Sequence, residues 1–170
     1  QVNFGSIMLA LVDGHPRILN LKQILYYYLK HQEEVITRRS RYELEKAEAK
    51  AHILEGLLIA LDHIDEVIRT IRESRTDEVA KTALISKFGL SEKQAVALLD
   101  MRLRRLTGLE RDKIEADYKD VQETIAYLRD LLSSREKIMG VVKAELTDEK
   151  NNFGDKRRTE IAAALGDMDV

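Results

Sequence analysis

Cysteine is absent from the 170-residue chain, which excludes disulfides, zinc–thiolate sites and cysteine nucleophiles. Tryptophan is absent as well, and aromatic residues make up only 5% of the chain, which disfavours an all-β sandwich. No apolar run is long enough to span a membrane, and no signal peptide is recognisable. The formal net charge of -2 excludes a uniformly basic nucleic-acid-binding protein but leaves room for local basic patches.

Hydrophobic residues (44%) and charged residues (34%) are both abundant, so the chain can bury a core and stay soluble. The prevalence of Leu, Ala, Glu, Lys and Arg favours helices. The length allows one large domain or two small ones. We therefore expect a soluble, mainly α-helical protein of the cytoplasm.

Helix-breaking residues are widely spaced. The single proline is Pro16, and no glycine or proline follows it before Gly56. Further uninterrupted windows precede Gly89 and separate Gly108 from Gly140. Three such windows predict long helices rather than many short elements.

Residues 1–19 have a different pattern, typical of a short β-hairpin. An apolar run from Ile7 to Val12 is followed by the turn-forming residues 13–16 and by a second short strand that ends at Leu19. The first strand is apolar on both faces, so we expect it to pack on protein that lies outside this segment.

Residues 20–55 and 109–150 predict two arms of a long antiparallel coiled coil. Asn20, with Gln23 three residues later, predicts the start of the outgoing helix. For the return arm, a Thr-x-x-Glu capping box at 107–110 starts a seam that alternates spacings of four and three up to Leu146. As one helix over 110–146, this arm would be ~55 Å long. A polar tail, 151–170, follows.

Residues 56–108 predict a small helical head between the arms. A helix runs from a cap at Thr76 or Asp77 to Phe88 and Gly89 stops it, while a capping box that starts at Ser91 opens a helix through Leu106. That last helix is apolar around most of its circumference, and so small a head has a small core, so we expect a second copy of the chain to cover one side. The expected dimer contact consists of Gln94, Ala95, Leu98, Met101, Arg102, Leu103 and Leu106. The alternative is that these residues close the head's own core.

Chemistry-bearing motifs are few. The pairs His52/Glu55 and His63/Glu66 have metal-ligand residue types, but both lie in one helical region, and surface ion pairs are the simpler interpretation. No phosphate loop or nucleophile elbow occurs, and helix packing accounts for the six tyrosines. Basic clusters that could contact DNA phosphates, or simply be solvated, include Arg38, Arg39 and Arg41.

Four segments carry a distinctive combination of motifs: AHILEGL at 51–57, LSEKQA at 90–95, LRRLTGLER at 103–111 and FGDKRRTEI at 153–161. Asn3-Phe4-Gly5 and Asn20-Leu21-Lys22 belong to the same pattern. In this order they resemble the A subunits of bacterial DNA gyrases, which are type IIA DNA topoisomerases. The resemblance covers nearly the whole chain and fades after Ile161. The A subunit of topoisomerase IV shares the architecture and is the alternative.

The resemblance implies the coiled coil and globular tip of the exit gate, or C-gate. In that family, two A subunits meet through their tips below a cavity that receives a transported DNA duplex, and the enzyme uses ATP. It implies a homodimer through the head, the gyrase B subunit as a partner, and transient contact with double-stranded DNA. For a gate that opens and closes, we expect the arms to act as stiff levers that flex near Gly56, Gly108 and Gly140.

The resemblance implies no catalytic, cofactor-binding or metal-binding residue here. The family's DNA-cleaving tyrosine follows an Ala-Ala-Thr-Arg motif, which this chain lacks, and ATP and Mg²⁺ belong to the B subunit. The rival functions are a generic coiled-coil scaffold that dimerises along its arms and a stand-alone metal enzyme.

Overall fold

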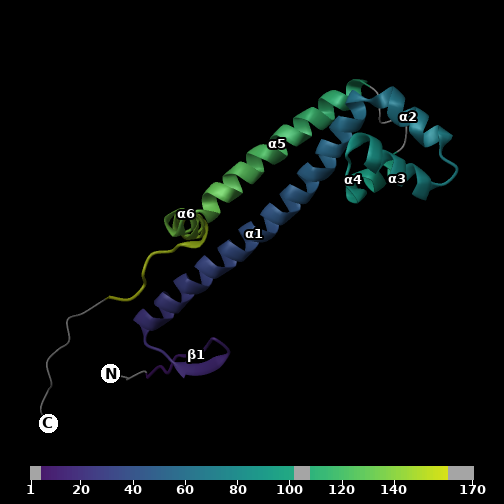
Figure 1. Cartoon of the computed structure of the whole chain (residues 1–170). Helices are drawn as coiled ribbons and strands as arrows, with labels where there is room; N and C mark the ends of the chain where they lie inside the picture. Colours follow the sequence, from purple (N-terminus) through teal and green to yellow (C-terminus); the bar gives the residue numbers. More distant parts are fainter. Residues whose placement is uncertain (1–4, 102–107, 161–170) are drawn as a thin grey trace, which may run out of the picture.

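The computed structural model of the protein describes residues 5–101 and 108–160. In this part of the chain, two strands, β1 (Leu9–Val12) and β2 (His15–Ile18), precede six helices. The helices are α1 (Leu21–Asp62), α2 (Ile64–Glu73), α3 (Asp77–Phe88), α4 (Glu92–Asp100), α5 (Gly108–Leu132) and α6 (Arg135–Phe153). Figure 1 shows a long arm of α1 and α5, with α2–α4 at one end and the hairpin at the other. The expected mainly helical class with an N-terminal hairpin is confirmed.

The hairpin strands pair antiparallel, with Val12 opposite His15. Asp13 (φ 51°) and Gly14 (φ 78°) connect them. Positive φ at both positions is the signature of a type I′ turn, in which Asp-Gly is a favoured pair. The predicted hairpin is confirmed, but its turn is tighter than the expected residues 13–16, because His15 and Pro16 already belong to β2.

α1 is a single helix of 42 residues, which corresponds to ~63 Å of length. The predicted capping box is present: Asn20 Oδ1 accepts from the Gln23 N–H at 2.9 Å, and the Gln23 side chain accepts from the Asn20 N–H at 2.9 Å. The helix continues through Gly56 without a break and ends at Asp62. Its last turns therefore belong to the head as well as to the arm.

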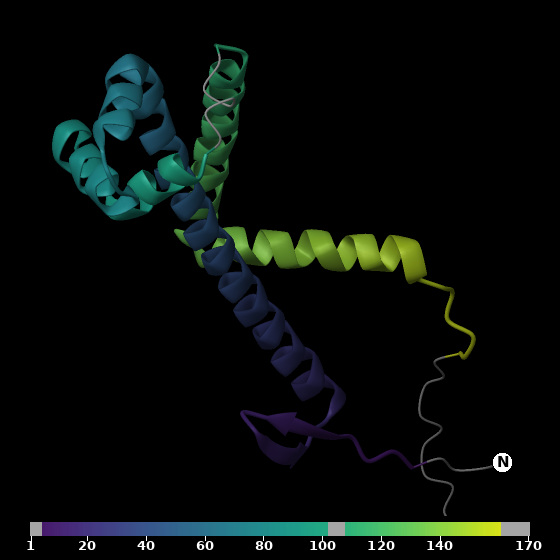
Figure 2. The ribbon, with the colours of Figure 1, turned by 90° about the vertical axis from the view of Figure 1, so that its right-hand side faces the viewer.

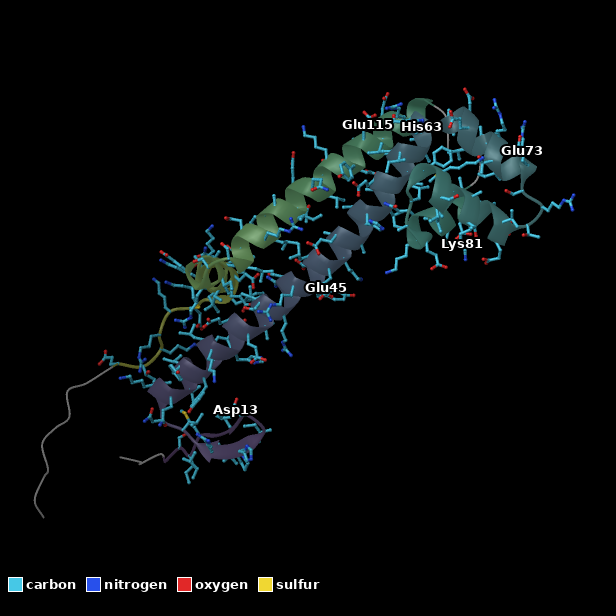
Figure 3. All side chains as sticks on the ribbon, viewed as in Figure 1. Asp13, Glu45, His63, Glu73, Lys81 and Glu115 are labelled. Carbon is cyan, nitrogen blue, oxygen red and sulfur yellow. The ribbon has the colours of Figure 1, made fainter. Side chains whose placement is uncertain are left out.

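α5 runs back antiparallel to α1 and forms the predicted coiled coil with it (Figure 1). The buried seam residues of α5 are Ile114, Val121, Ile125 and Leu128. On α1, Ala51 and Leu54 are buried in the seam, and the partly buried Leu44 and Ala47 pack beside them. Figure 3 shows charged side chains, such as Glu45 and Glu115, projecting from the remaining faces of the arm. Within the described residues, no helix has both the length and the apolarity needed to cross a membrane.

The expectation of one uninterrupted return helix over 110–146 is wrong. α5 ends at Leu132, and α6 starts at Arg135 and turns across the arm, as Figure 2 shows. Two serines satisfy the backbone groups that this break exposes. The Ser133 hydroxyl donates to the Asp130 carbonyl at 2.6 Å, and Ser134 Oγ accepts from the Glu136 N–H at 3.2 Å. We call the junction of α5 and α6 the elbow.

The apolar seam continues through the elbow because α6 also packs on α1. Ile138 and Val142 of α6 and Leu131 of α5 form a buried cluster with Ile36 of α1. The register shifts by one residue at the elbow: the four-three spacing predicts Leu132 and Met139 in the seam, whereas the structure buries Leu131 and Ile138. The spacing also does not report whether the helix is continuous.

The head consists of α2, α3 and α4 packed on the last turns of α1. Its capping signals are confirmed: Thr76 caps α3, Gly89 takes a left-handed conformation (φ 66°), and Ser91 forms a capping box with Gln94. The core residues are Leu57, Ala60, Leu61, Val67, Leu84, Leu90, Ala95 and Leu98.

The prediction that the last head helix reaches Leu106 is wrong, because α4 ends at Asp100 and Met101 is extended. The Met101 N–H bonds to the Leu98 carbonyl, three residues back, which tightens and closes the last turn. The predicted capping threonine of α5, Thr107, lies outside the described residues.

Two glycines within helices should respond oppositely to substitution by alanine. A Cβ at Gly140 would meet no atom within 4 Å, so Gly140→Ala should raise the free energy of unfolding by about 0.5–1 kcal/mol. A Cβ at Gly56 would lie 2.6–2.8 Å from the Gln94 side chain, so Gly56→Ala should lower it by about 1–2 kcal/mol. Urea unfolding followed by circular dichroism measures both changes. A stabilisation of both variants would contradict the close packing at Gly56.

Candidate functional site

The residues predicted to form a dimer contact do not share one environment. Gln94, Ala95 and Leu98 face the core and are 5%, 0% and 3% exposed, so they close the head's own core, as in the alternative interpretation. Met101 is half-buried at the end of α4. The other predicted residues lie outside the described part of the chain; they are Arg102, Leu103 and Leu106. The dimer contact itself stays a prediction.

The opposite side of α4 is open. Lys93, Val96 and Asp100 are exposed there, and we call these three residues the outer face of α4. Val96 is 41% exposed, and Val79 on neighbouring α3 is 54% exposed. The head therefore presents apolar side chains on α3 and α4 that the rest of the described chain does not cover.

A half-buried polar network joins α4 to α1. Gln94 Nε2 donates to the His52 carbonyl of α1 at 2.7 Å, and Gln94 Oε1 accepts from the Ser91 N–H at 2.8 Å. The Ser91 hydroxyl lies 2.7 Å from His52 Nε2. Gly56, one turn further along α1, leaves room for the Gln94 side chain. We call these four residues the α1–α4 clasp. From the sequence, Ser91 was predicted only to cap a helix and Gln94 to cap it and to join the dimer contact; neither contact with His52 was predicted.

The histidines considered as metal ligands have other contacts. His52 belongs to the clasp, and the His63 ring lies 5.9 Å from the Phe88 ring, where α1 meets the head (Figure 3). Across residues 5–101 and 108–160, no group of three or more His, Cys, Asp or Glu side chains could hold a metal ion.

The three arginines predicted as one basic cluster are separated by the fold. Arg39 donates to Glu145 of α6 at 2.5 Å, and this hydrogen bond raises the pKa of Arg39. Arg38 and Arg41 instead line a groove of about 730 Å³ between α1 and α6, together with Lys30. Arg39 thus helps to hold α6 against α1, whereas Arg38 and Arg41 share their groove with Glu33 and Glu34. A contact of these arginines with DNA stays a prediction.

An ion pair holds the elbow. Arg135 Nε and a terminal nitrogen donate to the two oxygens of the Glu33 carboxylate at 2.6 and 2.9 Å, a bidentate arrangement. This hydrogen bonding lowers the pKa of Glu33. The heptad spacing placed Arg135 at an apolar seam position, and the sequence did not predict that Glu33 would bind it. The sequence does contain a sign of this ion pair: a charged residue occupies an apolar heptad position directly after Ser133-Ser134.

Exposed apolar side chains gather at the end of the molecule opposite the head. They come from the hairpin and from the first turns of α1, and we call them the apolar base. Its members are Ile7, Met8, Leu9, Leu11, Ile18, Leu21, Leu25, Tyr26, Tyr28 and Leu29. A two-stranded hairpin is marginally stable alone, and exposed apolar patches of this kind mark interaction surfaces. The apolar base is the surface that the predicted contact with protein outside the segment would cover.

Glu33→Gln should destabilise the chain near neutral pH, and the difference should vanish in acid. Because the folded pKa of Glu33 is lowered, the ion pair stabilises folding above the unfolded pKa of a glutamate, ~4.3. This stabilisation is lost as the pH falls through the lower folded pKa. Urea unfolding at neutral and at strongly acidic pH measures the difference. Glu34→Gln is the control, since Glu34 lies 3.9 Å from Arg38 on the exposed surface. A difference that persists in acid would contradict the assignment.

Known proteins are similar in sequence to this chain over all or nearly all of its length. The family of DNA gyrase and topoisomerase IV A subunits matches residues 1–147. The A subunit of DNA gyrase from Clostridium acetobutylicum is 56% identical over 170 residues, which is 100% of this chain and 20% of that protein. The A subunits of the Streptococcus pneumoniae and Staphylococcus aureus gyrases are 60% and 58% identical over 161 residues, or 95% of this chain and 20% and 18% of theirs.

The chain spans about a fifth of the length of these relatives. All three carry the name of the gyrase protein, so the alternative of topoisomerase IV is not favoured. The match extends over the hairpin, both arms and the head, which are the parts that the motifs identified. The chain belongs to the family of DNA gyrase and topoisomerase IV A subunits.

Proposed function

We propose that the chain is the exit-gate segment of a gyrase A subunit. The whole enzyme would be an ATP-dependent type II topoisomerase that passes one DNA duplex through another and supercoils DNA. Two copies would meet through their heads, open to release the transported duplex, and close again. The observation that carries the proposal is the separation of the apolar base from the head along α1, a helix of 42 residues.

The apolar base supports an attachment role for the hairpin end. Since the chain is about a fifth of the length of its relatives, much of the parent protein lies outside it. Covering the base with that protein would remove exposed apolar area such as Leu11 (74% exposed) and Ile18 (72% exposed) from water. The head would then be the free end of a lever.

The gate contact would be made by the outer face of α4 and the residues after it. Val96 and Met101 supply apolar surface there, and the predicted Arg102, Leu103 and Leu106 follow in the chain. Gln94, Ala95 and Leu98 would support this surface from inside. A standard interface buries about 800 Å² per partner. Because association costs offset much of the resulting stabilisation, such a contact can both hold and open.

The segment would contribute no catalytic group of its own. ATP and Mg²⁺ would be bound by the B subunit, and the DNA-cleaving tyrosine would lie outside this segment of the parent protein. Arg38 and Arg41 are the candidates for transient contact with a passing duplex, because they line an open groove, whereas Arg39 is held by Glu145 of α6. The enzyme would act in the cytoplasm, where bacterial DNA lies.

Val96→Asp tests the gate contact. A charge on the outer face of α4 should raise the Kd of the dimer at least about tenfold, which corresponds to ~1.4 kcal/mol, without changing the circular dichroism of the chain. Sedimentation equilibrium measures the Kd, both for this chain and for the full-length protein.

Ala126→Asp, on the exposed side of α5, is the matched control and should leave the Kd unchanged. A scaffold that dimerises along its arms predicts the opposite pattern, in which the α5 variant weakens the dimer. That pattern, or a chain that stays monomeric at high concentration, would contradict the proposal.

A further inference from the structure

The α1–α4 clasp is a half-buried polar network at the edge of the apolar core, with Gln94 as its buried polar member. Gln94 is 5% exposed, and each polar group of its side chain has a partner within the chain. Its carbonyl accepts from the Ser91 N–H, and its amide nitrogen reaches both the carbonyl and the ring of His52. Gln94 is therefore buried, with both polar groups of its side chain engaged inside the head rather than presented to a second copy of the chain.

The contacts of His52 assign its tautomer. Gln94 Nε2 can only donate, and it lies 3.4 Å from His52 Nδ1, so that ring nitrogen accepts. His52 Nε2 therefore carries the proton and donates to the Ser91 hydroxyl at 2.7 Å. The same hydroxyl accepts from the Gln94 N–H at 3.2 Å. His52 of α1 thus binds the capping residue Ser91, and Ser91 in turn binds Gln94, which contacts α1.

Gly56 controls how closely the two helices approach. A glycine inside a helix costs roughly 1 kcal/mol relative to alanine, yet Gly56 lies within the longest helix of the chain. A Cβ at this position would come within 2.6 Å of the Gln94 side chain. The missing side chain lets Gln94 lie directly on the surface of α1.

We propose that Gln94 is a positioning residue for the gate, which sets the rotation of α4 about its own axis. Successive helical residues are ~100° apart, so holding Gln94 against α1 directs Lys93, Val96 and Asp100 away from it. A rotation of α4 by one residue would turn the outer face toward the core. This inference rests on the proposed function, since it explains how the gate surface is presented.

Gln94→Glu separates this role from helix capping. Glutamate is as good a partner as glutamine in a capping box, so α4 keeps its start. The variant loses the donor to the His52 carbonyl and places a carboxylate oxygen against it. Gln122→Glu, the same change on the exposed side of α5, is the matched control. Gly56→Ala, which displaces Gln94 without changing a polar group, is the second test variant.

The absence of cysteine allows spin labels to be placed at two chosen sites. Labels at Lys93→Cys on α4 and Ala126→Cys on α5, diluted with unlabelled chain, report the position of α4 relative to the arm within one copy. We expect a single narrow distance distribution, which Gln94→Glu and Gly56→Ala broaden or shift and Gln122→Glu leaves unchanged. An unchanged distribution in both test variants would overturn the inference.

The dimer supplies a second readout. The Kd should rise about tenfold in Gln94→Glu, the equivalent of one hydrogen bond of ordinary strength. A Kd unchanged while the label distribution broadens would also overturn the positioning role. Because the label distance is measured within one copy, it tests the positioning role of Gln94 even if the chain does not dimerise. Failure to dimerise would contradict the proposed function instead.

Discussion

α1 holds the molecule together, because the head, α5 and α6 all pack against it. α1 is too sparsely apolar in its middle to form a core by itself, and it exposes most of its charged side chains. One narrow face is buried, first by α6 near Ile36 and then by α5 up to Leu54. Ion pairs such as Arg129–Glu48 flank this seam, and at such exposed sites each adds little to stability, so apolar burial carries most of it.

The buried side chains form two clusters that share α1. The larger cluster runs from the seam of α1 and α5 into the head without interruption, and the smaller one lies under the elbow. Because the same cluster continues from the arm into the head, the two parts should move as one body. The elbow has its own small core and its own ion pair, Arg135–Glu33. In the proposed gate, this division would let the arm and head transmit motion as one body while the elbow stays a separate unit.

Sequence reasoning succeeded where the determining interactions are local. The Asp13-Gly14 turn, the Asn20 and Ser91 capping boxes, and the left-handed Gly89 all depend on residues within a few positions of each other. The antiparallel arms followed from the seam, because one apolar face requires a partner and the chain must turn back.

The missed features depend on tertiary packing. The break at Ser133-Ser134 shifts the buried register by one residue, to Leu131 and Ile138. Apolar residues stand at both registers, so the heptads did not reveal the break. An apolar residue that faces a partner copy and one that faces its own core look alike in sequence, which is why Leu98 was assigned to a dimer contact. The clasp escaped notice because His52 and Gln94 are far apart in the chain and meet only after α4 packs on α1.

The proposed exit gate requires two copies of the chain to join head to head with their apolar bases apart. Small-angle X-ray scattering of the dimer tests this directly, because α1 alone is ~63 Å long. Joined heads with diverging arms predict a maximum dimension well above that of a single chain. A dimer no longer than one chain would place the arms side by side and contradict the head-to-head arrangement.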